Sequence, residues 1–245
     1  MTTPAYFLSD AHLTLNDNDK ELERRRHLFH FFDMIKQSGG TLFIVGDFFD
    51  FWFEYKQVIP KDYFTVLSNL YDLKTAGIEI HFILGNHDYW TNDFLDDSLG
   101  IHVHRSAAEV TIDGQRIHLT HGDGLLAHDS GYRLMRRILR SRAVIFLFRW
   151  LHPDLGINLA QSASHASRKN NQPDDQGEAN FEELLHYAQD RWAEGCDMVV
   201  MGHYHLHQLH TNSDGKSFLC LGDWISHSSY GKLNRGRLTL ESWTI

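Results

Sequence analysis

Five short polar motifs each begin where an apolar, strand-like run of residues ends. Helical spacing separates the first three strands, and such alternation predicts βαβ units around parallel strands. Open α/β sheets bind ligands beyond the carboxyl ends of their strands, so one edge of an α/β fold can gather all five motifs. In chain order the motifs are Asp10-Ala11-His12, Gly46-Asp47-Phe48-Phe49-Asp50, Gly85-Asn86-His87-Asp88, His121-Gly122-Asp123 and Gly202-His203-Tyr204-His205.

The elements around these motifs follow from hydrophobic periodicity and turn residues. We expect strands at 6–8, 41–45 and 78–84, helices at 20–38 and 61–76, and hairpin turns at 113–114 and 214–215. Residues 125–176 show helical periodicity followed by a polar stretch at 162–176. A chain of 245 residues fits one domain. The sequence therefore predicts a single α/β domain over 1–245 with a helical insertion at about 125–176.

Composition excludes several classes of protein. The formal charge of -9 argues against a general nucleic-acid-binding protein, which needs cations against phosphates. The two cysteines, Cys196 and Cys220, predict buried thiols in a reducing compartment rather than a disulfide framework. We expect no signal peptide, because no basic segment precedes an apolar one at the start of the chain. The longest apolar run, 143–148, is too short to span a bilayer.

The motifs offer oxygen and imidazole ligands but no thiolate, a mixture that suits Mn²⁺, Fe²⁺ or Zn²⁺ better than Ca²⁺. Seven such ligands are too many for one catalytic ion with an open position. They suit two ions about 3.5–4 Å apart, which can activate water and stabilise an in-line displacement at phosphorus. Alone, each of these residues could be a turn or cap residue, and His207, His210 and His227 compete as ligands. The seven candidates are Asp10, His12, Asp47, Asn86, His121, His203 and His205.

The insertion carries a local positive charge that contrasts with the acidic whole. Residues 133–149 hold six arginines, and no acidic residue lies between Asp129 and Asp154. Four arginines share one helical stripe, and an aromatic and apolar run follows at 146–151. This pattern predicts a membrane-surface element or a lid over an amphiphilic ligand, with ordinary helix packing as the alternative. The stripe consists of Arg133, Arg136, Arg137 and Arg140.

The order of the motifs, with Gly131-Tyr132 before the basic insertion, resembles the calcineurin-like metallophosphoesterase superfamily over most of 6–227. It is most similar there to the UDP-2,3-diacylglucosamine diphosphatases of lipid A biosynthesis. The resemblance implies a two-sheet β sandwich flanked by helices. It also implies two divalent ions, Mn²⁺ in that family, with Asp47 bridging them. One ion would be held by Asp10, His12, Asp47 and His205, and the other by Asp47, Asn86, His121 and His203.

The same resemblance implies further roles. His87 would contact the substrate phosphate or protonate the leaving group, and Asp88 would orient His87. The substrate would be a nucleotide-linked acyl sugar, cleaved to UMP at the cytoplasmic face of the inner membrane, so an anionic membrane surface is the expected partner. The expected substrate contacts are Asn86, His87, Tyr132, Arg133, Arg137, Ser167, Arg168 and Lys169.

One residue differs from the pattern of those enzymes, so other substrates remain as alternatives. Many of those enzymes carry arginine at the position of His87, and only histidine is a ready proton donor near neutral pH. A phosphodiesterase or phosphatase acting on a soluble nucleotide or phosphoprotein is therefore the alternative. A non-catalytic scaffold is disfavoured, because every expected ligand position is filled.

Overall fold

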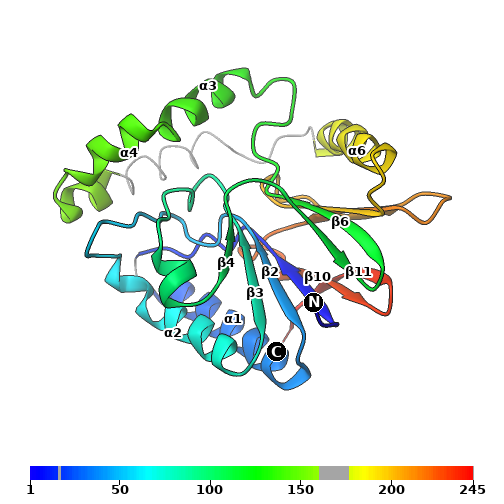
Figure 1. Ribbon diagram of the computed structural model, residues 1–245, viewed down its shortest axis with the longest axis horizontal. Helices are drawn as coiled ribbons and strands as arrows, with labels where there is room; N and C mark the ends of the chain where they lie inside the picture. Colours follow the sequence, from blue (N-terminus) through cyan, green and yellow to red (C-terminus); the bar gives the residue numbers. More distant parts are fainter. Residues whose placement is uncertain (16–17, 160–176, 245) are drawn as a thin grey trace.

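Two β-sheets packed face to face form the centre of the molecule, and helices cover the outer face of each (Figure 1). The computed structural model describes residues 1–15, 18–159 and 177–244. The sheet orders are β11-β10-β1-β2-β3-β4 and β5-β6-β7-β9-β8. The predicted two-sheet sandwich flanked by helices is confirmed.

The first sheet contains β1 (Ala5–Leu8), β2 (Thr41–Val45), β3 (Glu79–Ile83), β4 (His102–His104), β10 (Ser229–Asn234) and β11 (Arg237–Ser242). The second contains β5 (Ala108–Ile112), β6 (Gln115–Thr120), β7 (Met198–Met201), β8 (His207–Thr211) and β9 (Ser217–Leu221). Strands β1 to β4 are parallel to one another, as are β6, β7 and β9. The loops that leave these strands carry the five motifs.

The covering helices follow the predicted spacing closely. Helix α1 (Asp19–Ser38) begins after Asn18, whose side chain accepts a hydrogen bond from the Glu21 backbone N–H at 3.0 Å. The segment predicted as one helix over 61–76 is a 3₁₀ turn, η1 (Lys61–Tyr63), followed by α2 (Phe64–Thr75). A π-helical turn, η2 (Phe94–Ser98), precedes β4, and α6 (Gly177–Ala193) covers the second sheet.

Three apolar layers hold these elements together. The middle layer joins the two sheets, where Phe7 stacks on Phe43 with ring centroids 5.0 Å apart. A second layer lies between the first sheet and helices α1 and α2, and a third lies between the second sheet and α6. Cys196 and Cys220 are buried free thiols, as predicted.

Residues 130–159 form an arm that extends over the strand ends (Figure 1). It contains α3 (Ser130–Leu139), α4 (Arg142–Arg149) and a helical segment at 153–159. Within α3 and α4, which the structure describes in full, no side chain is buried. None of the described helices is both long enough and apolar enough to cross a membrane. The rest of the expected insertion, 160–176, lies outside the described residues.

Candidate active site

The loops after β1, β2, β3, β6 and β7 bring the seven candidate ligands to one place at the edge of the sandwich. The imidazole Nε2 of His12 lies 3.8 Å from both Asp10 Oδ1 and Asp47 Oδ2. The Nε2 atom of His205 is also 3.8 Å from Asp10 Oδ1. The rings of His121 and His203 lie 5.0 Å apart, centroid to centroid.

Asp47 lies between the two halves of this cluster. Its Oδ2 atom is 3.3 Å from His121 Nε2 on one side and 3.8 Å from His12 Nε2 on the other. Its Oδ1 atom accepts a hydrogen bond from the backbone N–H of His87 at 2.9 Å. The carboxylate is therefore fixed in an orientation that directs one oxygen to both groups of candidate ligands.

The backbone at the candidate ligands is strained. Left-handed φ is uncommon for residues other than glycine and costs on the order of 1–3 kcal/mol each. Strain of this kind persists where surrounding structure enforces it, commonly at functional sites. Among the described residues, five of the eight non-glycine positions with positive φ are candidate ligands: Asp10 (52°), His12 (41°), Asp47 (51°), His203 (69°) and His205 (55°).

Glycines make room for these side chains. A Cβ atom on Gly85 would lie 2.2 Å from Asp47 Oδ1, and one on Gly202 would lie 2.7 Å from Asp10 Oδ2. Both contacts are too close for a side chain to be accommodated. The glycines that end these strands therefore let the two carboxylates approach the neighbouring loops.

The hydrogen bonds of His121 indicate that its outer nitrogen faces a cation. Its Nδ1 lies 3.0 Å from the Val45 carbonyl and donates to it. Its Nε2 then faces two oxygens, Asp47 Oδ2 at 3.3 Å and Asn86 Oδ1 at 3.1 Å. Burial alone would lower the pKa of His121, but the Asp47 carboxylate outweighs it and raises the pKa to about 10. A proton or a metal ion must lie among these atoms.

The atoms around Asp10 also require a cation between them. Asp10 is fully buried, and its Oδ1 has no hydrogen-bond partner among the described residues. Its neighbours are the Nε2 atoms of His12 and His205, each 3.8 Å away. Ions with bonds of about 2.0–2.2 Å to nitrogen and oxygen fit between atoms at this spacing. The residues present therefore fit divalent metal ions in both halves of the cluster.

Asp223, which carried no prediction, orients His205. The Nδ1 atom of His205 is 3.3 Å from Asp223 Oδ2, which leaves Nε2 directed at Asp10. Burial opposes protonation of His205, but the bond to Asp223 dominates and raises its pKa. His227 also binds Asp223, at 2.9 Å, and stacks on His207. Gly222-Asp223 follows β9 just as Gly46-Asp47 follows β2, so the sequence did carry the signal.

Asp88 does not make the contact with His87 that the resemblance implied. The oxygens of Asp88 accept hydrogen bonds from the backbone N–H groups of Gly85 and Phe48, at 2.6 and 2.9 Å. The Nδ1 atom of His87 lies 2.6 Å from the backbone carbonyl of Asp50. The contact expected of Asp88 is thus made by Asp50, and Asp88 joins two ligand-bearing loops instead. The His87 side chain is about 20% exposed at the site.

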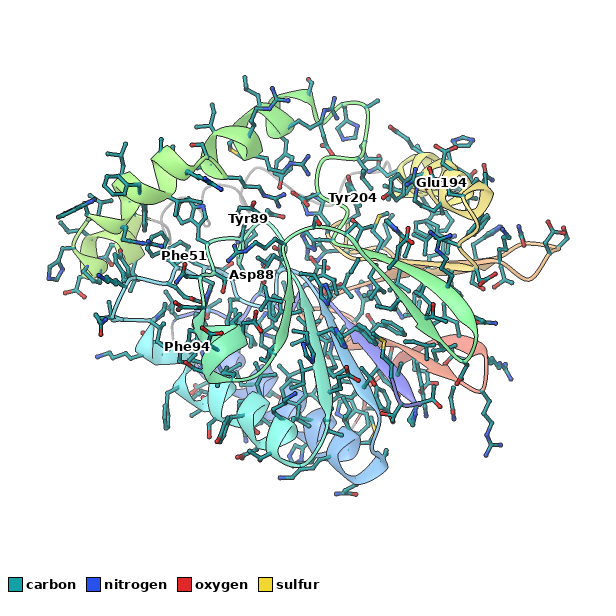
Figure 2. All side chains as sticks on the ribbon, in the orientation of Figure 1. Phe51, Asp88, Tyr89, Phe94, Glu194 and Tyr204 are labelled. Carbon is teal, nitrogen blue, oxygen red and sulfur yellow. The ribbon has the colours of Figure 1, made fainter. Side chains whose placement is uncertain are left out.

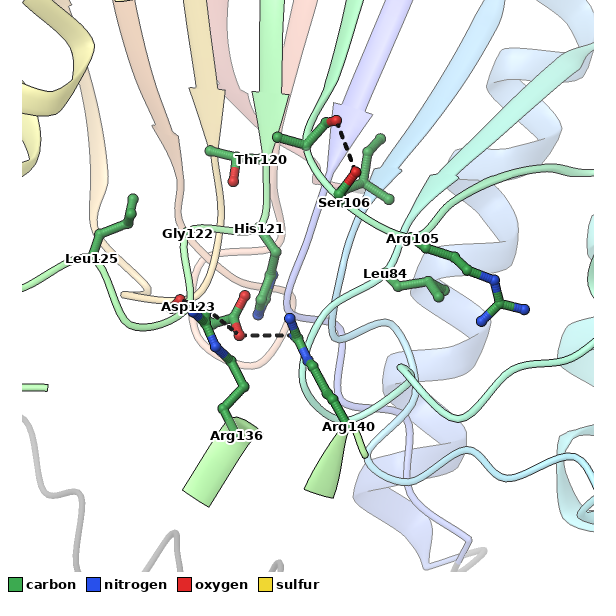
Figure 3. A pocket seen from close by; sticks show the side chains of 12 residues that line it. Leu84, Arg105, Ser106, Thr120, His121, Gly122, Asp123, Leu125, Arg136 and Arg140 are labelled. Atoms are coloured by element: carbon green, nitrogen blue, oxygen red, sulfur yellow. Dashed lines mark hydrogen bonds and ion pairs between the residues drawn. The ribbon is translucent and has the colours of Figure 1, made fainter. Parts of the chain in front are cut away.

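Two arginines of α3 connect the arm to the site through Asp123. Arg136 Nη1 lies 3.0 Å and Arg140 Nη2 lies 2.8 Å from Asp123 Oδ2 (Figure 3). Together with His121, these side chains line a cavity of about 210 Å³. Tyr132 lies at the same place, with its hydroxyl 3.3 Å from Asp123 Oδ2. The cavity offers a cationic wall next to the candidate ligands.

The other predicted substrate contacts fall elsewhere. Arg133 donates to the backbone carbonyls of Leu126 and Ala127, so it holds the loop before α3. Arg137 is exposed, whereas Arg136 is partly buried. Ser167, Arg168 and Lys169 lie outside the described residues.

Aromatic contacts fasten the arm above the site. The Phe148 ring lies 4.7 Å from those of both Phe53 and Trp90, centroid to centroid. The Trp90 indole N–H donates to the Leu139 carbonyl at 2.9 Å. Phe51 and Tyr89 lie beneath the arm (Figure 2), and Arg140 stacks over the Tyr89 ring at 4.2 Å. The described part of the arm is therefore anchored at its inner side.

Two facing mixed sheets with a buried cluster of aspartate, histidine and asparagine at the strand ends define a metal-dependent hydrolase of the metallophosphoesterase type. The model of the family described as calcineurin-like phosphoesterase matches residues 3–207. The chain belongs to this family.

A relative from Porphyromonas gingivalis, named UDP-2,3-diacylglucosamine hydrolase, is 32% identical over 257 residues, covering 99% of this chain and 98% of the relative. A Haemophilus ducreyi protein of the same name is 28% identical, covering 89% of this chain and 91% of its own length. Among solved structures, a phosphoesterase from E. coli is 17% identical with a TM-score of 0.47, covering 98% of this chain and 93% of that one.

Proposed function

We propose that this protein hydrolyses the diphosphate bond of UDP-2,3-diacylglucosamine, giving UMP and 2,3-diacylglucosamine 1-phosphate in lipid A biosynthesis. The observation that carries the proposal is the ion pairing of Asp123 with Arg136 and Arg140. These ion pairs connect the arm, which has an apolar surface, to the loop that carries the candidate metal ligand His121. The names of the relatives supply the substrate class.

The proposed cofactor is a pair of divalent ions, Mn²⁺ in the first place, with Fe²⁺ or Zn²⁺ as the alternatives. Such a pair activates the attacking water and stabilises charge on the phosphoryl oxygens. Asp47, which faces both groups of ligands, would contribute to both positions. Asp10, His12 and His205 complete one, and Asn86, His121 and His203 complete the other.

The chain's own residues orient the diphosphate. Arg136 and Arg140 present guanidinium groups, which match phosphate oxygens better than an ammonium does. The His87 imidazole, held by the Asp50 carbonyl, faces the cluster and contacts the phosphate that is attacked. Tyr132, with its hydroxyl beside Asp123, contacts the substrate at the same place.

The arm selects the lipid and docks at an anionic membrane surface. Its outer side exposes Trp150 (77%), Leu147 (66%), Leu134 (61%) and Phe146 (59%). Arg137, Arg142 and Arg149 are exposed among them. Apolar and cationic groups together favour the boundary between lipid head groups and acyl chains. Residues 1–245 thus act as one domain that works peripherally at the cytoplasmic face of the inner membrane.

Product analysis in ¹⁸O water with Mn²⁺ tests the proposal. UMP carrying the label is the expected result with UDP-2,3-diacylglucosamine as substrate. Turnover of simple nucleotide diesters with no cleavage of the acylated substrate would contradict it.

A second candidate is hydrolysis of a soluble phosphodiester or phosphomonoester. The imidazole at position 87 favours it, because an alkoxide leaving group needs a proton more than a phosphate does. The ratio of kcat/KM for UDP-2,3-diacylglucosamine to that for a chromogenic phosphodiester separates the two candidates. The first predicts a ratio well above one, and the second a ratio below one.

A further inference from the structure

A second group of metal-ligating side chains lies on the far face of the second sheet, against α6. Glu109 on β5 and His118 on β6 are directly opposed cross-strand partners, and Cys196 lies two residues before β7. One ligand atom from each lies within 4.8 Å of the other two. His118 is three residues before His121, a separation of about 10 Å along a strand. The group is therefore separate from the candidate active site.

The unsatisfied nitrogen of His118 points into this group. His118 is only 6% exposed. Its Nε2 lies 2.9 Å from the Tyr187 hydroxyl on α6, which fixes the ring. Its Nδ1 has no hydrogen-bond partner among the described residues and lies 3.8 Å from Glu109 Oε1. A buried nitrogen without a partner is costly, and a bound cation would satisfy it.

The three donors match a zinc site. Glu109 Oε1 is 4.0 Å from Cys196 Sγ, and Arg116 binds the other carboxylate oxygen, Oε2, at 2.6 Å. Zn²⁺ takes thiolate, imidazole and carboxylate ligands at about 2.3 Å from sulfur and about 2.0 Å from nitrogen. The three ligand atoms lie within 4.8 Å of one another, so small movements of these side chains would bring them to those distances. The Tyr187 hydroxyl then supplies the outer partner that a ligating histidine usually has.

The electrostatics agree with this geometry. Burial and, to a lesser extent, the nearby Arg191 lower the pKa of His118, so the imidazole is neutral and free to coordinate. Burial and the Glu109 carboxylate raise the pKa of the Cys196 thiol. A cation at this position would favour the thiolate, as metal coordination does elsewhere.

We propose that Glu109, His118 and Cys196 form a structural Zn²⁺ site that ties the segment after α6 to the β5–β6 hairpin. The ion would complete its tetrahedron with water on the side of Glu109. Because the site binds only the folded chain, Zn²⁺ would stabilise the protein against unfolding.

Cobalt spectroscopy on the full chain tests this site apart from the catalytic one. The seven candidate catalytic ligands include no thiolate, so only the new site gives a near-ultraviolet thiolate-to-cobalt charge-transfer band. We expect the band in the wild-type protein and in Cys220→Ala, and its loss in Cys196→Ala. Absence of the band from the wild type at saturating Co²⁺, or its persistence in Cys196→Ala, would overturn the proposal.

Glu109→Gln covers the case in which Cys196→Ala fails to fold, since Glu109 is partly exposed and glutamine keeps its shape. We expect this variant to keep the band but to bind Co²⁺ about tenfold more weakly or worse. Zinc analysis after dialysis gives an independent count. The wild type should retain one more equivalent than Cys196→Ala or His118→Gln, and equal counts would contradict the site.

Discussion

The strand-end edge and the arm are built in opposite ways. At the edge four of the candidate ligands are buried: Asp10 is 0%, Asp47 and His121 are each 2%, and His12 is 7% exposed. Backbone hydrogen bonds and strained φ angles hold these residues in place. The arm exposes most of its apolar side chains and buries none in α3 or α4.

This difference separates two tasks. Phosphoryl transfer depends on atoms held within tenths of an ångström, which suits a buried, hydrogen-bonded edge. Holding an acylated substrate at a membrane depends on apolar area, which suits an exposed surface. The two regions meet at Asp123 and Trp90, so variants on either side of that junction should affect different properties.

The largest effect is expected at the edge. Asp47→Asn keeps the side-chain volume and an oxygen for the His87 N–H but removes the charge between the two halves. We expect kcat to fall on the order of 10³-fold for every substrate, as when a preorganised charge is lost. The thermal midpoint and circular dichroism check the fold. Asp214→Asn, in the exposed β8–β9 turn, is the charge-matched control, and an equal loss there would reject this role for Asp47.

The arm gives the next effect and should depend on substrate. Replacing Phe146, Leu147 and Trp150 together with serine removes exposed apolar surface without touching the edge. At about 1 kcal/mol per side chain the loss on vesicle-borne UDP-2,3-diacylglucosamine should be about 10²-fold in kcat/KM. Activity on a small chromogenic phosphodiester should stay within about twofold. Phe64→Ser, an exposed apolar residue on α2, is the control, and equal losses on both substrates would remove the distinction between the regions.

A smaller effect is expected where Asp223 supports the edge. Asp223→Asn should weaken metal affinity about 10–100-fold, because His205 loses the carboxylate that orients its ring. Isothermal titration with Mn²⁺ measures this directly. Activity should recover at high Mn²⁺, whereas a loss that excess metal does not restore would show that Asp223 acts in another way.

The smallest effect concerns pH and the buried sheet. Burial lowers the pKa of His81 to about 4. Between pH 6.5 and pH 4 this histidine is therefore protonated in the unfolded chain but neutral in the folded chain. Stability should therefore decline as pH falls from 6.5 towards 4. His81→Asn should flatten that decline in urea unfolding curves. The exposed His128→Asn, near the arm, should leave the slope unchanged, and a slope equal to wild type in His81→Asn would contradict the effect.

Much of the edge was predictable because its signals are local. A glycine at the end of an apolar run, followed by aspartate, asparagine or histidine, predicts both the end of a strand and the placement of a ligand. The same pattern occurs at Gly222-Asp223, but the ligand that its carboxylate orients depends on how β9 pairs with β7 and β8. The partner of each carboxylate depends on such pairings, so the contacts of Asp88 could not be derived from spacing.

The sequence predicted that the arm is a basic helix, but it could not predict which way each arginine side chain points. Helical periodicity placed four arginines on one stripe, yet only packing decides which of them face the protein. Arg136 and Arg140 face Asp123, Arg133 binds loop carbonyls, and Arg137 is exposed. The position of the Asp123 carboxylate, directly after β6, determines that Arg136 and Arg140 are the two arginines of the stripe that pair with it.

Anomalous diffraction from crystals soaked in Mn²⁺ tests the central claim most directly. Two peaks about 3.5–4 Å apart are expected, with Asp47 Oδ2 between them. Asp10 and His205 should contact one ion, and Asn86 and His203 the other. Peaks elsewhere, or density at the strand ends that contains no manganese signal, would contradict the account.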